Sequence, residues 1–195
     1  MRRRPVKRSV MLLLAVGMVG CHTFVKMKPD FNEIPTDALR AVAVEIERAV
    51  QEGNRQPEIA SRDGVVVDGD VVKQAVRARA ARSELINAFL NTGHAWERRN
   101  GMLHIIRSSE YKKLGRKSDR DRRAYLIWNE EQNRWALYEG ILKDSNFRPR
   151  SLGAIQRIFY EARLEVMPDG QKYEDAAGNV AVIGGGPASA EPFQY

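Results

Sequence analysis

The sequence predicts a mainly helical domain with a few short extended segments. The first observation is a long amphipathic stretch, Ser118 to Lys143, in which large apolar residues recur at steps of three and four. The second is that shorter stretches with the same helical spacing precede and follow it, whereas the apparent strands are brief and bounded by turns. The third is a length typical of one domain, about 100–200 residues, without an internal repeat.

The first twenty residues have the composition of an export signal. A basic start is followed by an apolar run, Val10 to Val19, that is too short to span a bilayer comfortably. The run ends in Gly20-Cys21, which resembles the lipobox of bacterial lipoproteins. We therefore expect residues 1–20 to be a lipoprotein signal peptide and Cys21 to be lipidated. An ordinary secretory signal and a short membrane anchor are the alternatives.

Cysteine usage and charge narrow the possible functions of the exported protein. Cys21 is the only cysteine, so the chain has no internal disulfide, and we expect no thiolate catalysis. Five of the 32 basic residues and none of the 25 acidic residues precede Cys21, so the formal charge of +7 falls to +2 after cleavage. Nucleic-acid binding thereby loses its main support. We expect no nucleic-acid partner and no cofactor.

The first part of the exported chain predicts a tether and two helices. Residues 21–35 contain two prolines and few apolar residues at any regular spacing, as expected of a tether. Apolar residues have helical spacing from Thr36 to about Glu52. The same spacing from Val71 to Asn91 predicts a second helix, with Asp70 at its N-cap. Between them, Val65 to Val67 is flanked by Asp-Gly pairs. Their spacing fits no EF-hand, so a short strand between turns is favoured over a calcium loop.

The middle of the chain predicts a turn, a short strand and a basic run. Asn100-Gly101 is a strong turn signal, and Met102 to Ile106 follows it as a candidate strand. His94, Glu97 and His104 match no standard zinc spacing, so we expect no metal site. Basic residues are concentrated between residues 112 and 123, where either a solvated surface or an anionic partner would explain them.

The second half predicts the central helix, one further helix and a hairpin. Ser118 is placed to cap the central helix with Asp121 as the acid of a capping box. Its predicted buried face includes two tryptophans and is formed by Ala124, Ile127, Trp128, Glu131, Trp135, Tyr138, Ile141 and Leu142. A helix from Ser151 to about Val166 follows. The turn at 168–170 and the segments 172–173 and 180–183 predict a small hairpin or an extended segment, and residues 184–195 predict a flexible tail. The folded domain is therefore expected to span residues 36–183.

Three ordered motifs resemble the YdbL-like proteins, a family of exported bacterial envelope proteins. The first motif is matched by Gly93, Glu97, Asn100, Gly101 and Leu103, with Trp96 where the family usually has glycine. The second is matched by Glu131, Asn133, Arg134, Tyr138 and Leu142, and the third by Pro168-Asp169-Gly170, Tyr173 and Gly178. The lipobox and the helix that begins at Thr36 are additions to the family pattern.

The resemblance implies a small exported protein without an established enzymatic activity, associated with AsmA-like bridge proteins that are proposed to move phospholipid between membranes. We therefore expect a lipid-anchored accessory protein in the periplasm, on the outer membrane rather than the inner one because His22 follows Cys21. Two alternatives are a lipid carrier with an apolar cavity and a peptidoglycan-active enzyme. No pair of carboxylates stands out for glycoside cleavage, so we expect no enzyme.

The expected partner surface lies around the 96–101 turn and the basic run. It combines a large aromatic residue with arginines, the usual anchors of protein interfaces, and with cations that suit an acidic partner. The expected partner-binding residues are Trp96, Glu97, Arg98, Arg99, Lys112, Lys113, Arg116 and Lys117.

Overall fold

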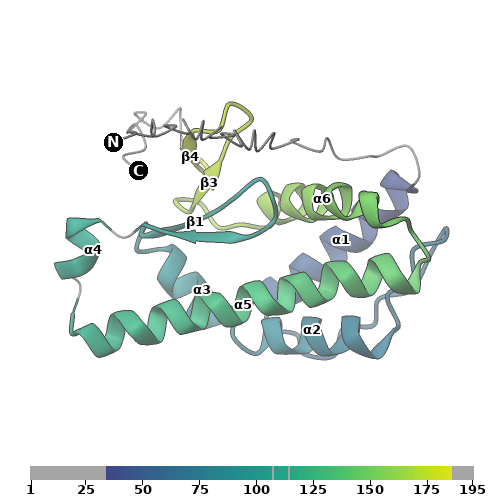
Figure 1. Ribbon diagram of the computed structural model, residues 1–195, viewed down its shortest axis with the longest axis horizontal. Coiled ribbons are helices and arrows are strands. Elements are labelled where there is room, and N and C mark those ends of the chain that lie inside the picture. The colour runs from purple at the N-terminus through teal and green to yellow at the C-terminus, as the bar shows by residue number, and fades with distance from the viewer. Residues whose placement is uncertain (1–33, 107, 114, 186–195) are drawn as a thin grey trace, which may run out of the picture.

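The computed structural model describes residues 34–106, 108–113 and 115–185 of the chain. The predicted signal peptide, Cys21, all but the last two tether residues and residues 186–195 of the predicted tail lie outside these ranges. Within them the chain is mainly helical with one small sheet, which confirms the predicted fold class (Figure 1). Among the described residues, no helix is both long and apolar enough to cross a membrane.

The helices follow the predicted order with two differences. The predicted helix over residues 71–91 is wrong as a single element, because the backbone at Arg82 leaves the helical region (φ −115°, ψ 0°) and divides it in two. A short helix also forms just before the central one, where the sequence predicted only a basic run. The helices are α1 (Thr36–Gln51), α2 (Asp70–Ala80), α3 (Ser83–Leu90), α4 (Ser109–Lys113), α5 (Lys117–Asp144), the 3₁₀ turn η1 (Pro149–Ser151) and α6 (Leu152–Leu164).

Four short strands form one sheet in the order β2-β1-β3-β4. The strands are β1 (Ala95–Glu97), β2 (Leu103–Ile105), β3 (Lys172–Glu174) and β4 (Val180–Val182). Strand β2 and the β3–β4 hairpin confirm the prediction, whereas the parallel pairing of β1 with β3 was not predicted. The predicted strand Val65 to Val67 is wrong, because only Val65 forms a bridge, to Arg62 across a tight turn. Val65 and Val67 instead enter the core.

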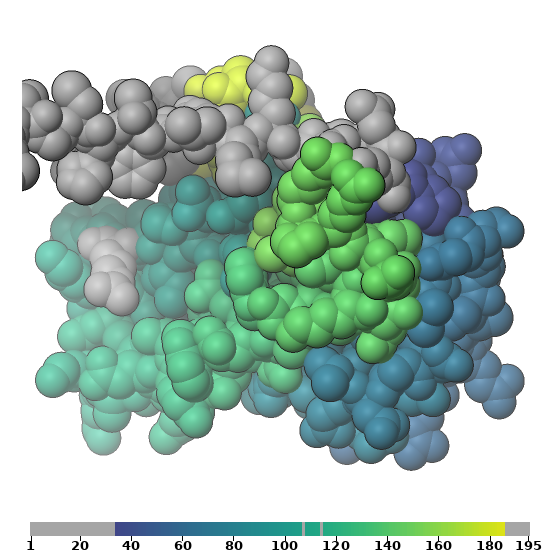
Figure 2. All heavy atoms as spheres, turned by 45° about the vertical axis from the view of Figure 1, so that its right-hand side comes forward, coloured from purple at the N-terminus to yellow at the C-terminus, as the bar shows by residue number. Residues whose placement is uncertain are grey.

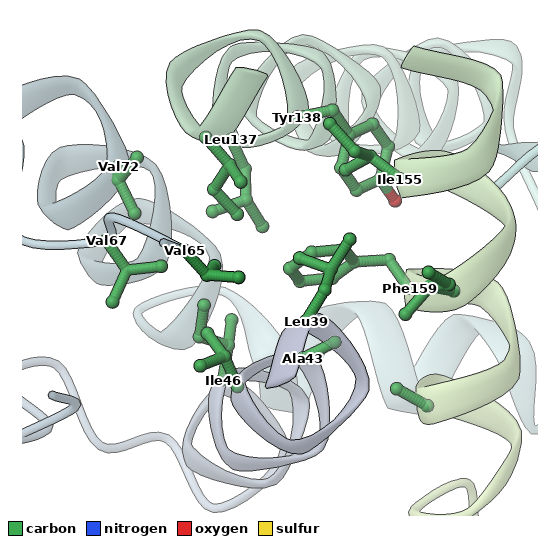
Figure 3. Close-up of a cluster of buried hydrophobic side chains, with 14 of the residues drawn as sticks. Leu39, Ala43, Ile46, Val65, Val67, Val72, Leu137, Tyr138, Ile155 and Phe159 are labelled. Carbon is green, nitrogen blue, oxygen red and sulfur yellow. The ribbon is translucent and has the colours of Figure 1, made fainter. Parts of the chain in front are cut away.

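The main core lies where four helices meet. Helix α2 packs along α5, and α1 packs along α6. Figure 3 shows side chains from these helices and from the segment before α2 converging on one apolar centre, with Leu39, Leu137 and Phe159 inside it. Gly140 allows α2 to approach α5 closely, because a Cβ there would lie 2.8 Å from a methyl group of Val72. A second, smaller cluster lies between α3, the sheet and the first half of α5.

Helix α5 is confirmed, but its cap and its buried face differ from the prediction. The helix begins after Arg116, whose backbone N–H donates to the Asp119 carboxylate at 3.1 Å, so the Ser118–Asp121 capping box is wrong. The predicted burial of Trp128 and Trp135 is also wrong, since they are 53% and 41% exposed. The helix is rotated because its interior face includes two charged residues. That face is formed by Ile127, Glu130, Arg134, Leu137, Tyr138, Gly140 and Ile141.

Candidate functional site

Six buried charged residues form a closed ring at the centre of the domain, which we call the charge ring. Three arginines alternate with three glutamates, so each charge lies between two of the opposite sign and the ring has no net formal charge. Six ion pairs close it, and five elements supply its members: α1, α2, β1, α5 and α6. In ring order the members are Glu47, Arg79, Glu130, Arg134, Glu97 and Arg163.

The geometry of the charge ring is that of strong, charge-assisted hydrogen bonds. Arg79 binds both carboxylate oxygens of Glu47 at 2.8 Å, and Arg134 binds both of Glu97 at 2.7 and 2.8 Å. Such two-point pairs hold a guanidinium and a carboxylate in one plane. Arg163 closes the ring with bonds of 2.8 Å to Glu97 and 3.1 Å to Glu47. The ring therefore fixes the relative positions of the helices and the sheet.

The electrostatics of the charge ring favour the ionised forms of two glutamates and the three arginines. Burial acts to raise the pKa of Glu130, but Arg79 and Arg134 outweigh burial and hold that pKa at about 2. Burial acts on Glu47 in the same way, and Arg163 with Arg79 holds its pKa well below the ordinary value. Burial acts to lower the pKa values of the arginines, whereas the neighbouring glutamates raise them. Acid–base catalysis works best with a pKa near the operating pH, which Glu47 and Glu130 do not have.

The turn at 98–101 is attached to the charge ring through Tyr138. The Tyr138 hydroxyl donates to the Gly101 carbonyl at 2.9 Å and accepts from Arg163 at 3.1 Å. Gly101 has a φ of +76°, and a Cβ there would lie 2.9 Å from the carbonyl oxygen of Gln156. The structure thus brings together Glu97, Gly101, Arg134 and Tyr138, four positions at which the sequence resembles the YdbL-like motifs. Glu47, Arg79, Glu130 and Arg163 complete the arrangement and were not predicted.

The predicted partner surface around Trp96 is corrected by the structure. Trp96 is 5% exposed and lies over His104, with ring centroids 4.4 Å apart, and Glu97 is fully buried in the charge ring. Neither side chain is therefore available to a partner. The two arginines that follow bind the β3–β4 hairpin: Arg98 lies 3.9 Å from the Glu174 carboxylate, and Arg99 donates to the Ala176 carbonyl at 2.6 Å. All three residues of strand β1 are buried, so the strand does not show the alternation of buried and exposed residues that is typical of a half-exposed strand.

The basic part of the predicted surface is exposed. Its residues, Lys112, Lys113, Arg116 and Lys117, all present exposed side chains, and we call them the basic segment. Tyr111 joins α4 to the first turn of α5 by donating its hydroxyl to the Arg120 carbonyl at 3.3 Å. Figure 1 shows α4 beyond the N-terminal end of α5, so the basic segment lies at one end of the long helix.

Three aromatic residues lie on the exposed side of α5, and we call them the aromatic face. Tyr125, Trp128 and Trp135 are 64%, 53% and 41% exposed. The rings of Tyr125 and Trp128 stack with centroids 5.8 Å apart and an interplanar angle of 25°. Trp135 follows Trp128 by seven residues, about two helical turns, so the three rings lie along the same side of the helix. The spacing of aromatic residues signalled this stripe in the sequence, but it was assigned to the core.

His94 and Glu97, two of the residues weighed as zinc ligands, have other partners in the structure. Among the described residues, no cluster of three or more His, Cys, Asp or Glu is placed to hold a metal ion. His94 lies instead against the ring of Tyr111, with centroids 5.8 Å apart, and Glu97 binds two arginines.

Comparison of the chain with protein-family models, with curated proteins and with solved structures finds no match. The resemblance to the YdbL-like proteins therefore stays a prediction from the sequence.

Proposed function

We propose that the protein is a lipid-anchored accessory protein of the cell envelope that binds an envelope protein through the aromatic face of α5. The observation that carries the proposal is the exposure of Tyr125, Trp128 and Trp135 in one stripe. Large aromatic side chains clustered on a surface mark an interaction site, because leaving them in water has a free-energy cost that a partner removes. A helix with such a stripe suits an apolar groove in its partner.

The charges around the aromatic face favour a protein partner over a lipid surface. The same side of α5 carries an exposed acid, Asp121, one turn before Tyr125, and Glu139 lies one turn after Trp135. Anionic headgroups would be repelled by Asp121, whereas Glu139 is paired with Lys143 at 3.5 Å and adds charges of both signs. An apolar centre with charges of both signs around it is instead the usual organisation of a protein interface. The basic segment extends this surface beyond the start of α5, where it would meet an acidic part of the partner.

A binding role is also supported by how the chain uses its buried charges. The six members of the charge ring neutralise one another, and the pKa values of Glu47 and Glu130 lie well below neutral pH. These carboxylates hold the fold together rather than exchange protons with a substrate. The resemblance to the YdbL-like proteins points to an AsmA-like bridge protein as the first partner to test, and it supports the periplasmic location. The anchor at Cys21 is supported by the lipobox-like sequence and not by this resemblance.

Site-specific crosslinking in intact envelopes tests the proposal. A photoreactive amino acid placed at Trp128 or Trp135 should capture an integral envelope protein, and an AsmA-like bridge protein is the expected product. Leu85 on α3 is 59% exposed and serves as the matched control position, from which this product should be absent. Capture of lipid alone from α5 would contradict the proposal, as would equal capture of the same protein from Leu85.

The anchor is tested separately. Cys21→Ser should leave the chain unprocessed or release it from membranes, because the residue that carries the lipid is then missing. Membrane fractionation and the intact mass of the chain report this outcome. An unchanged mass together with unchanged fractionation would contradict lipidation at Cys21.

A further inference from the structure

A pocket of about 290 Å³ lies between α1, α2 and the segment that joins them. It is separate from the charge ring and from the exposed side of α5. Figure 2 shows the joining segment and α2, in blue, together on one side of the molecule. The pocket is lined by Ile46, Arg55, Gln56, Pro57, Ile59, Val67, Val72, Lys73, Val76 and Arg77.

The pocket combines an apolar floor with a positively charged rim. The floor is formed by core residues, since Ile46, Val67, Val72 and Val76 are all buried. The rim carries the exposed cations Arg55, Lys73 and Arg77, and no acidic residue lines the pocket. Within the described part of the chain, none of these three cations forms an ion pair with a carboxylate.

The charges at the rim are arranged in a way that an anion would stabilise. Lys73 and Arg77 are four residues apart on α2, so they lie on the same side of the helix and repel each other. Arg55 adds a third positive charge from the segment that joins α1 to α2. An apolar floor has a low dielectric constant, which strengthens the field of these cations inside the pocket. A bound anionic group would offset the repulsion and receive charge-assisted hydrogen bonds.

We propose that this pocket binds a single-chain anionic amphiphile, with its carboxylate or phosphate head at Arg55, Lys73 and Arg77 and its apolar chain on the floor. Small-molecule sites usually enclose about 300–1,000 Å³, so a pocket at the lower end of this range suits one chain rather than a two-chain phospholipid. This site is independent of the proposed docking through α5, because it uses a different surface and a different class of ligand.

Photolabelling of the full-length chain, held in phosphatidylcholine nanodiscs, tests the site. The probe is decanoic acid carrying a diazirine, and labelled peptides are mapped by mass spectrometry. We expect labels within residues 55–59 and 72–77. Decanoate and decyl phosphate are the two competitors, and whichever of them competes identifies the head group. Inorganic phosphate and decyltrimethylammonium should compete at least about tenfold less well, since they lack the chain or the negative charge.

Paired substitutions decide whether the rim cations bind the ligand. Lys73→Gln with Arg77→Gln should lower labelling about tenfold, because two charge-assisted contacts are lost. Arg48→Gln with Arg122→Gln removes the same charge from exposed positions on α1 and α5 that do not line the pocket, and should leave labelling unchanged. Melting curves confirm that both double variants fold. Undiminished labelling of the first variant would overturn the proposal and show that the aliphatic stems of these cations only cover the apolar floor. Equal competition by decyltrimethylammonium would also overturn the proposal.

Discussion

Replacing Arg134 by methionine should destabilise the domain strongly, because it leaves the charge ring with an unbalanced buried negative charge. Arg134 is 2% exposed and donates to Glu130 at 2.8 Å and to both oxygens of Glu97 at 2.7 and 2.8 Å. Removing one partner of a buried ion pair costs about 3–5 kcal/mol. For a domain of this size, that corresponds to a fall in melting temperature of about 6–20 °C.

Urea denaturation followed by circular dichroism measures the loss of unfolding free energy directly. The matched control is Arg62→Met, because Arg62 also pairs with both oxygens of one carboxylate, at 2.8 and 2.9 Å from Glu45. This pair is 36% and 40% exposed, so its loss should cost less than about 1 kcal/mol. If Arg134→Met costs no more than Arg62→Met, the reasoning about the charge ring is refuted.

A double substitution separates lost charge balance from lost packing. Arg134→Met combined with Glu97→Gln removes one cation and one anion, so the ring is neutral again. The double variant should therefore be more stable than the sum of the two single losses predicts, by about 0.5–3 kcal/mol. Strict additivity would mean that the two side chains act independently, contrary to their direct contact at 2.7 Å.

Three further predictions concern acid stability, helix packing and the tryptophans. Because the pKa of Glu130 is lowered from 4.5 to about 2, the unfolded state binds a proton first, so unfolding free energy should fall as pH decreases from about 4.5 to about 2. Glu130→Gln should make the free energy of unfolding, measured by urea titration, depend less on pH over this range. An unchanged pH dependence would contradict the assignment of the effect to Glu130. Gly140→Ala should lower the melting temperature despite the better helix propensity of alanine, because its Cβ would lie 2.8 Å from Val72; a raised melting temperature would show that α2 moves aside freely. Trp96→Ala should cost about 3–5 kcal/mol and Trp135→Ala less than about 1 kcal/mol, as 5% and 41% exposure imply, and the reverse order in thermal melts would contradict the structure.

The sequence predicted those helices and strands that are determined by residue patterns within the segment itself. The helices at 36–52 and 151–166 and most of the central helix follow from apolar spacing within each segment, and the β3–β4 hairpin follows from its turns. Pairing of β1 with β3 depends on residues far apart in the chain, so local patterns carry no trace of it. The break at Arg82 was also missed, because residues 77–84 contain no glycine or proline to mark the end of a helix.

The charge ring could not be predicted, because periodicity assigns charged residues to the surface. Arg79 lies between the large apolar residues of the predicted helix over residues 71–91, yet it is 1% exposed. Its burial depends on Glu47 and Glu130, which are supplied by two other helices. The same reasoning placed Trp128 and Trp135 inside, because aromatic residues were taken to mark the core. On α5, tryptophans are therefore exposed where burial was expected, and charged residues are buried where exposure was expected. The cause lies in contacts with other elements, which the sequence of α5 alone does not contain.

Carbene footprinting of the aromatic face, in purified protein and in intact envelopes, tests the proposed function most directly. Trp128 and Trp135 should be labelled strongly in the purified chain and become protected in envelopes, where the partner covers them. Trp96 should stay unlabelled in both, and exposed Leu85 on α3 should be labelled in both. Equal labelling of Trp128 and Trp135 in purified protein and in envelopes would contradict the proposal that α5 binds an envelope partner.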